Sequence, residues 1–156
     1  MAGVEARLAE LGIELPDVAP PVAAYIPAVV TGQYVYTSGQ LPFDAGALPA
    51  TGKVGDGSGL VPADDAKGYA RTAVLNALAA VRAELGSLDR VTRIVKLVGF
   101  VASDPSFTGQ PGVINGASEL LGEVFGEAGR HARSAVGVAV LPLDSPVELE
   151  LVVEFA

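Results

Sequence analysis

The chain has 156 residues, the length of one domain with a short arm. Half of the residues are hydrophobic and only 18% are charged, so the composition excludes a disordered chain and predicts an oligomer that covers an apolar face. The net charge of −8 opposes nucleic-acid binding, and the lack of cysteine excludes disulfides and thiolate metal sites. With His131 as the single histidine, no histidine-rich metal site is expected.

Targeting and membrane signals are missing from the sequence. The first residues lack a basic segment followed by an apolar one, and no run of about 18 apolar residues occurs. We therefore expect a cytoplasmic protein with no membrane partner.

The first 39 residues predict an arm and a hairpin. Residues 4–11 have apolar side chains at helical spacing and predict a short amphipathic helix. The prolines that follow, at positions 16, 20 and 21, predict an extended linker. Residues 25–31 and 34–39 are rich in Val, Tyr and Thr and flank Gly32-Gln33, which predicts a β-hairpin.

The rest of the chain alternates helices and strands. The predicted helices are 62–86, with Asp64 and Asp65 in its first turn, and a second within 111–126. Residues 93–102 predict a central strand, 134–141 a buried strand, and 147–155 a strand with one apolar and one acidic face. Residues 44–61 predict a loop with one short strand near Val54.

This order of elements predicts an α+β fold. The simplest arrangement is a sheet of four to six strands with two helices on one face. The other face would need cover, which a second subunit could supply. We divide the chain into an N-terminal helix and Pro-rich linker, residues 1–21, and one domain, residues 22–156.

Several motifs occur in an order and spacing that resemble one family. Arg133-Ser134 opens a strand, Leu141-Pro142 follows it, and the chain then reads VELE at residues 147–150. The TSGQLP run at 37–42, the AR…N pattern ending at Asn76 and the VK…FV strand at 95–101 fit the same pattern. Together these segments resemble the RidA family, also called YjgF or L-PSP. The N-terminal helix and the longer 44–61 loop resemble a longer, less characterised branch of it.

The resemblance implies a chorismate-mutase-like fold and a homotrimer. In the family the sheets of the trimer face inward, and a cleft lies at each subunit interface. Members hydrolyse reactive enamines and 2-imino acids to 2-keto acids and ammonium without a metal or organic cofactor. The implied ligand is thus a small imino or keto acid.

Two catalytic residues are implied by the resemblance. Arg133 matches the family's key arginine, whose planar fork can bind a carboxylate with two parallel hydrogen bonds. Glu148 matches a glutamate that could position water and move its proton. From the residues alone, Arg133 could instead pair with an acidic side chain, and Glu148 could be a solvated or ion-paired strand residue.

The resemblance also implies a substrate-binding set. Tyr25 matches an aromatic residue that lines the cleft, and Ser38 and Gly39 match the pocket floor. Asn115 falls where the family has an asparagine on its second helix. Three of these residues also have a structural interpretation: Tyr25 as a half-buried strand residue, Gly39 as a bulge, and Asn115 as the donor of a helix-to-loop hydrogen bond.

Two positions depart from the family pattern. Ala135 stands where well-known members have a cysteine, but it keeps the backbone N–H that helps to hold the carboxylate. His131 lies in an Arg-His-Ala run that replaces an aromatic-Pro-Ala run before Arg133. His131 could be a proton shuttle, or a packing or interface residue.

Three other functions stay open. The same cleft could bind a keto acid without turnover. The endoribonuclease activity attached to the family name is opposed by the negative charge and by the lack of interleaved aromatic and basic residues. A purely structural or chaperone-like trimer is the third alternative.

Overall fold

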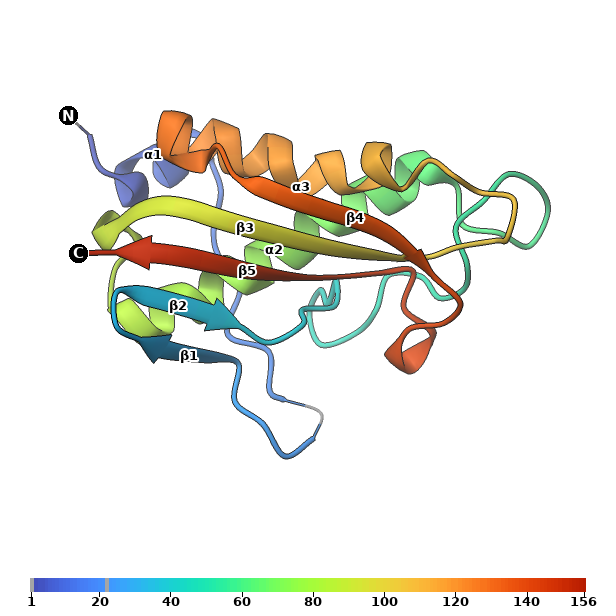
Figure 1. Cartoon of the computed structure of the whole chain (residues 1–156), viewed down its shortest axis with the longest axis horizontal. Helices are drawn as coiled ribbons and strands as arrows, with labels where there is room; N and C mark the ends of the chain where they lie inside the picture. Colours follow the sequence, from blue (N-terminus) through green and yellow to red (C-terminus); the bar gives the residue numbers. More distant parts are fainter. Residues whose placement is uncertain (1, 22) are drawn as a thin grey trace.

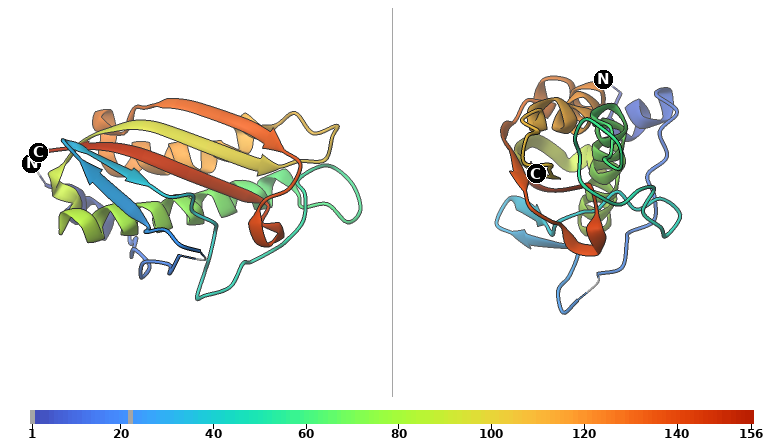
Figure 2. Two further views of the ribbon diagram at one scale, coloured as in Figure 1. Left: turned by 60° about the horizontal axis from the view of Figure 1, so that its bottom comes forward. Right: turned by 90° about the vertical axis from the view of Figure 1, so that its right-hand side faces the viewer.

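The computed structural model describes residues 2–21 and 23–156. It contains a five-stranded sheet in the order β1-β2-β5-β3-β4, with two long helices on one face (Figures 1 and 2). Only the pair β3–β4 is parallel, so the sheet is mixed. The predicted α+β class and the strand number are confirmed. The elements are α1 (Val4–Glu10), β1 (Ala28–Thr31), β2 (Tyr34–Thr37), α2 (Ala63–Leu85), β3 (Val91–Ala102), α3 (Gln110–Phe125), β4 (Ala132–Val138) and β5 (Val147–Phe155).

Helix α2 forms where the sequence predicts it. Pro62 precedes its first turn, where Asp64 and Asp65 face the positive end of the helix dipole. It ends at Gly86, whose φ of 81° is the left-handed conformation that favours glycine. Small side chains bring the helix close to the sheet, and the fully buried ones are Ala66, Ala70, Ala73 and Ala77.

The core lies between these helices and the sheet. Alternate residues of β5 point to the helices and are buried: Val147, Leu149, Leu151 and Val153. The alternation predicted for this strand is confirmed. Glu148, Glu150 and Glu154 are half-buried on the opposite face.

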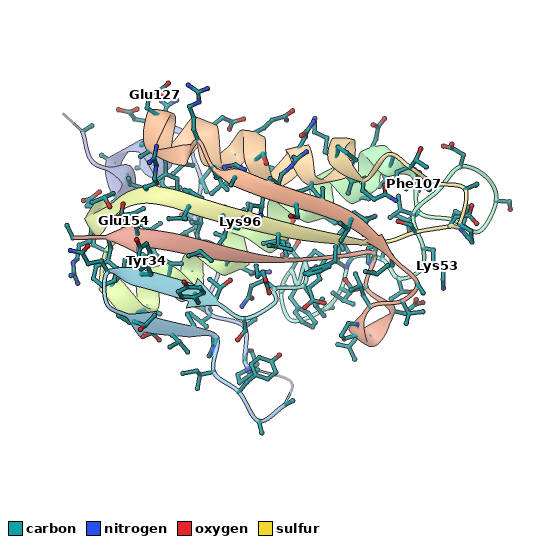
Figure 3. All side chains as sticks on the ribbon, in the orientation of Figure 1. Tyr34, Lys53, Lys96, Phe107, Glu127 and Glu154 are labelled. Atoms are coloured by element: carbon teal, nitrogen blue, oxygen red, sulfur yellow. The ribbon has the colours of Figure 1, made fainter. Side chains whose placement is uncertain are left out.

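The opposite face of the sheet carries many apolar side chains. Strand pairing places Tyr36 beside Val29 and Val152, with Val136 beside Phe100 further across. Val29, Tyr36 and Val136 are each more than 40% exposed. Tyr34, Lys96 and Glu154 lie on the same face (Figure 3). We call this face of the sheet the open face.

Two strand predictions are wrong in detail. The strand predicted as buried at 134–141 is β4, which lies at the sheet edge and has no fully buried residue. It ends at Val138, and Val140 beyond it is 67% exposed. An apolar run cannot distinguish a strand covered by its own chain from one left at an edge. Near Val54 the chain forms isolated bridges to Val61 and Ser103 instead of a strand.

The N-terminal arm packs on the helical side of the domain. Leu8 of α1 is buried, and Arg7 Nε donates to the Glu123 carbonyl oxygen at 3.0 Å. Residues 13–21 contain no helix or strand and run from α1 toward the loop before β1, as predicted (Figure 1). Within the described residues, no helix is both long and apolar enough to cross a membrane.

Candidate functional site

Four of the residues implied by the motifs gather beside the adjacent strands β2 and β5. Ser38 follows β2 directly, and its hydroxyl donates to the Ile26 carbonyl oxygen at 2.5 Å. The backbone N–H of Ser38 donates to the Pro27 carbonyl oxygen at 2.8 Å. These two bonds hold the loop that carries Tyr25, so the Ser38 side chain is occupied in fixing that loop.

Glu148 leans over the backbone of Gly39. A Cβ atom at position 39 would overlap the Glu148 carboxylate, so glycine is required for this approach. The hydrogen bonds between Gln40 and Leu149, at 2.7 and 3.1 Å, fix the two segments. Burial, and secondarily the negative charge of Glu150, raise the pKa of Glu148 above its ordinary value. Glu148 is thus more easily protonated than an exposed glutamate.

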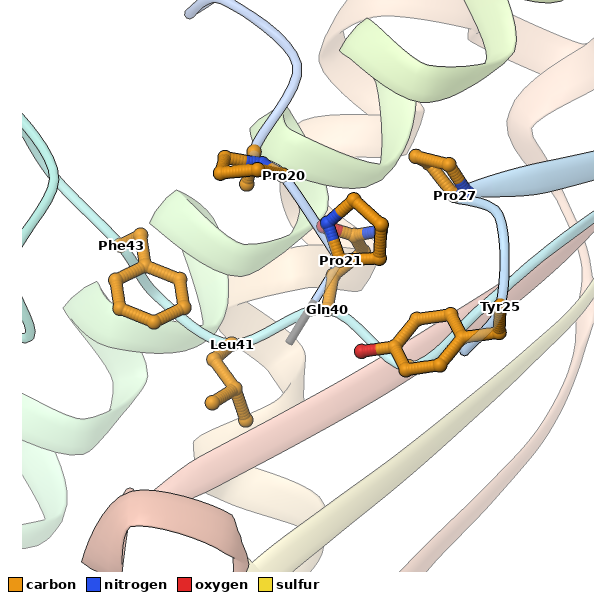
Figure 4. Close-up of a pocket in the computed structure, with 9 residues that line it drawn as sticks. Pro20, Pro21, Tyr25, Pro27, Gln40, Leu41 and Phe43 are labelled. Carbon is orange, nitrogen blue, oxygen red and sulfur yellow. The ribbon is translucent and has the colours of Figure 1, made fainter. Parts of the chain in front are cut away.

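A small pocket opens beside this group. Tyr25, Gly39 and Leu41 line it together with Pro20 and Pro21 of the N-terminal arm. Figure 4 labels four of these residues, Pro20, Pro21, Tyr25 and Leu41. Its volume of about 30 Å³ would hold a water molecule but not a small organic acid. A larger hollow of about 470 Å³ adjoins it and is also lined by the arm, by Phe43 and by Asn76. The arm therefore forms part of the walls near Tyr25.

Arg133 lies on the other face of the sheet, against α3. Its Nη1 donates to Asn115 Oδ1 at 2.8 Å and to Ser118 Oγ at 3.2 Å, and its Nη2 donates to the Pro111 carbonyl oxygen at 3.3 Å. All three acceptors are uncharged. Within the part of the chain that is described, no carboxylate oxygen lies within 4.0 Å of the Arg133 guanidinium.

These contacts use three of the five N–H donors of Arg133. The Nε proton and one Nη2 proton have no acceptor among residues 2–21 and 23–156. Two such donors can bind a carboxylate with parallel hydrogen bonds. Arg133 is therefore held in place and still has two N–H donors available for an anion.

Asn115 and Ala135 belong to the Arg133 group. Asn115 accepts a hydrogen bond from Arg133 through Oδ1, which leaves its Nδ2 donors without a partner within the described residues. Ala135 lies two residues after Arg133 on β4 and packs against the core on the same side of the sheet. The implied site residues thus form two groups: Tyr25, Ser38, Gly39 and Glu148 in one, and Asn115, Arg133 and Ala135 in the other.

Within one chain the two groups do not meet. Arg133 pairs with Leu97, which faces the helices, whereas Glu148 pairs with Phe100, which faces away from them. Strand β3 separates the two strands that carry them. A single chain therefore does not place the arginine and the glutamate around one small ligand.

Two supporting residues were not predicted. Asn76 is buried in α2 and donates through Nδ2 to the carbonyl oxygens of Leu41 and Phe43, both at 3.0 Å. The AR…N motif marked this position but gave no role for it. Ser118 contacts Arg133, and a lone serine on a helix gives no sequence signal of such a contact.

Metal ligands do not cluster in the described residues. No group of three or more His, Asp or Glu side chains could share an ion there. The chemistry available to these groups is anion binding by the arginine and proton transfer by the glutamate.

The fold and the two residue groups define an α+β protein of the chorismate-mutase-like class. The sequence model of the family described as "YjgF/chorismate mutase-like, putative endoribonuclease" matches residues 5–156. The chain therefore belongs to the YjgF family, as the motifs indicated.

Individual relatives extend over nearly the whole chain. "Protein TCP17" of Trypanosoma cruzi is 45% identical over 97% of this chain and 93% of its own length. The structure of "a putative endoribonuclease" from Shewanella oneidensis has a TM-score of 0.93 and 35% identity, covering 99% of this chain and all of that one. The structure of Escherichia coli TdcF "with bound serine" has a TM-score of 0.66 and 26% identity, covering 89% of this chain and 94% of that one.

Proposed function

We propose that this protein hydrolyses 2-imino acids, and the enamines that tautomerise to them, to 2-keto acids and ammonium. Water adds to the C=N carbon to give a carbinolamine. The C–N bond then breaks as the nitrogen takes up a proton and the oxygen gives one up. No electrons leave or enter, so the reaction needs no redox partner.

The Arg133 guanidinium carries this proposal. It is partly buried, oriented by three neutral oxygens, and without a carboxylate within ion-pair distance in the described residues. A partly buried cation with two free N–H donors favours an anionic ligand, and the carboxylate of an imino acid offers two oxygens to them. Binding this carboxylate orients the C=N group for attack.

Glu148 is the proposed proton-transfer group. Burial and the negative charge of Glu150 raise the pKa of Glu148 in the direction of neutral pH, and this makes the ionised carboxylate a more effective base. It can accept a proton from the attacking water and return it to the departing nitrogen. Gly39 fixes its approach, and Tyr25 forms a wall of the pocket beside Gly39.

The proposed site is shared between copies of the chain in a homotrimer. Arg133 and Glu148 project from opposite faces of one sheet, so they can surround one substrate only when they come from different subunits. The apolar open face, with Val29, Tyr36 and Val136 exposed, provides a surface that such an assembly would bury. The pocket of about 30 Å³ in the single chain is too small for the substrate, which is expected if a second subunit completes the site.

The relatives support a ligand with an amino acid's carboxylate. TdcF was solved with bound serine, which has a carboxylate next to a carbon that bears nitrogen. A 2-imino acid shares this arrangement. The same observation favours the second candidate, a binding protein that holds a keto acid or amino acid without turnover.

A trapping assay tests the proposal. An amino-acid oxidase generates the imine in the presence of semicarbazide, and semicarbazone formation is followed with wild-type and Arg133→Ala protein. Faster loss of imine, seen as less semicarbazone, is expected only with the wild type. Equal semicarbazone in both reactions and in the absence of protein would reject the deaminase and leave the binding protein.

RNA cleavage is the activity in the family's description and in the name of the Shewanella relative. A net charge of −8 opposes the phosphate contacts that such binding needs. RNA degradation by purified wild-type protein, absent from Arg133→Ala protein, would favour it instead.

A further inference from the structure

A chain of hydrogen bonds leads away from Arg133 through two residues that the proposed reaction does not use. Arg133 Nη1 lies 3.2 Å from Ser118 Oγ. Ser118 Oγ lies 2.9 Å from His131 Nε2, and His131 Nδ1 lies 2.6 Å from the Gly129 carbonyl oxygen. His131 and Ser118 are both half-buried.

For a neutral His131, only one arrangement of protons satisfies every step of this series of hydrogen bonds. A carbonyl oxygen can only accept, so His131 Nδ1 must carry the hydrogen that binds Gly129. Neutral imidazole has one N–H, which leaves Nε2 as an acceptor for the Ser118 hydroxyl. With its proton directed to His131, Ser118 presents its lone pairs to Arg133, which can only donate.

Packing fixes Gly129, the residue at the end of this hydrogen-bond series that lies away from Arg133. Gly129 is buried at the end of the 3₁₀ turn η2 (Gly126–Gly129), and a Cβ atom there would overlap the Leu121 carbonyl group. The backbone of Gly129, and with it the carbonyl group that binds His131, is thus fixed by close packing on α3. Its position sets the imidazole ring, and the ring in turn sets the Ser118 hydroxyl.

The near end fixes the guanidinium. Nη1 has two protons, and Asn115 and Ser118 accept one each. Together with the Pro111 carbonyl oxygen on Nη2, these acceptors define the plane and rotation of the guanidinium group. Without Ser118, one Nη1 proton would lose its acceptor and two contacts, to Asn115 and Pro111, would remain. The two N–H donors left for a carboxylate, on Nε and Nη2, would then be less firmly directed.

We propose that Ser118 and His131 are positioning residues that orient Arg133 for a carboxylate, with His131 held as the neutral Nδ1–H tautomer. Neither residue touches the substrate. The inference rests on the proposed function only in taking a carboxylate as the ligand of Arg133. It assigns a role to His131, the residue at which this sequence departs from the family motif.

The tautomer can be measured directly, because His131 is the only histidine. Long-range ¹H–¹⁵N NMR spectra at about pH 8.5, above the usual titration range of histidine, distinguish the two neutral tautomers. The Nδ1–H form is expected. The Nε2–H form, which predominates in free histidine, would overturn the proposed series of hydrogen bonds from Gly129 to Arg133.

Carboxylate binding tests the consequence for Arg133. The probe is 2-oxobutanoate, measured by calorimetry with the intact protein. Ser118→Ala and His131→Phe should each weaken binding by about 3- to 10-fold, the loss expected for one hydrogen bond. Ser118→Thr keeps the hydroxyl and should restore binding. Arg130→Ala, at an exposed arginine that contacts only Glu127, is the control and should bind like wild type.

If Ser118 and His131 had only a structural role, their variants would show a different kinetic pattern. Loss of local packing would lower the hydrolysis of every imine equally, whereas loss of orientation should raise KM for imino acids and leave imines without a carboxylate unchanged. Wild-type affinity in Ser118→Ala would overturn the inference. Binding of 2-oxobutanoate without imine hydrolysis would reject the deaminase but leave this inference intact, and no binding by wild type would overturn both.

Discussion

Arg133 and Glu148 project from opposite faces of the same sheet, on strands separated by β3. Arg133 contacts α3, and Glu148 covers Gly39 on the open face. In a single chain, a substrate whose carboxylate is bound by Arg133 cannot have its C=N carbon beside Glu148. This relationship makes the proposed chemistry depend on assembly.

Replacing Arg133 with lysine should lower kcat/KM for imino acids by about 10- to 100-fold, because lysine keeps the charge but loses the planar fork. Its ammonium cannot bind Asn115, Ser118 and a carboxylate with the same geometry. Steady-state kinetics with the trapping assay measure the effect. Unchanged kcat/KM would mean that the charge alone is sufficient and that the oriented fork has no role.

Gly39→Ala should remove most of the activity while the fold is retained. The new methyl group would occupy the position of the Glu148 carboxylate, so the glutamate must move. The matched control is Gly122→Ala on an open face of α3, where alanine should stabilise the helix by about 0.5–1 kcal/mol. Circular dichroism and the trapping assay compare the two variants. Normal activity in Gly39→Ala would show that the position of Glu148 does not matter.

Glu148→Gln should increase stability at neutral pH. Burial raises the pKa of Glu148 in the folded chain, so the folded chain holds this proton more tightly than the unfolded one. The stability due to the protonated form is present at low pH and is lost as pH rises through the raised pKa. The advantage of the glutamine variant should therefore grow as the pH rises above about 4.3, the ordinary pKa of a glutamate. Urea denaturation across this range measures it, and a constant difference would contradict the assignment.

The rate of hydrolysis should rise over the pH range in which Glu148 loses its proton, whereas the stability that this group contributes falls over it. If the ionised carboxylate accepts the proton of water, kcat should rise as pH increases through the raised pKa of Glu148. The Glu148→Gln variant should show a low rate without this rise. A pH profile that is the same in both proteins would remove Glu148 from the mechanism.

Asn76→Leu should destabilise the protein by about 2–4 kcal/mol, because two carbonyl oxygens beside the pocket lose their donors. Thr72→Ala, on the same helix, loses only a hydroxyl bond to Gly68 and is the control, with an expected change within about 0.5 kcal/mol. Chemical denaturation gives both values. Equal stability of the two variants would show that Asn76 does not hold the 41–43 segment.

The sequence predicted most of the fold because local signals agreed with tertiary packing. Pro62 and Gly86 bounded α2, and strict alternation marked the two faces of β5. It failed where burial depends on neighbours far along the chain. The residues of β4 look like a buried strand by composition, yet their place at the sheet edge is decided by where β3 lies.

The site was predictable as a set of residues but not as an arrangement. Motifs indicated Arg133 and Glu148, and alternation placed Glu148 on the acidic face of β5, but nothing in the sequence placed Arg133 on the opposite face of the sheet. Ser118 and His131 became visible only through distances, since a serine and a histidine 13 residues apart form no motif. The arm that lines the pocket near Tyr25 was predicted as a linker, with no place assigned to it.

Subunit mixing tests the central claim most directly. Arg133→Ala and Glu148→Gln proteins, each inactive alone, are unfolded together in equal amounts, refolded and assayed by imine trapping. If Arg133 and Glu148 of different subunits share each site, about a quarter of the sites regain both residues, and activity should return to about that fraction of wild type. No recovery, with the refolded wild type active in parallel, would contradict a shared site for imine hydrolysis.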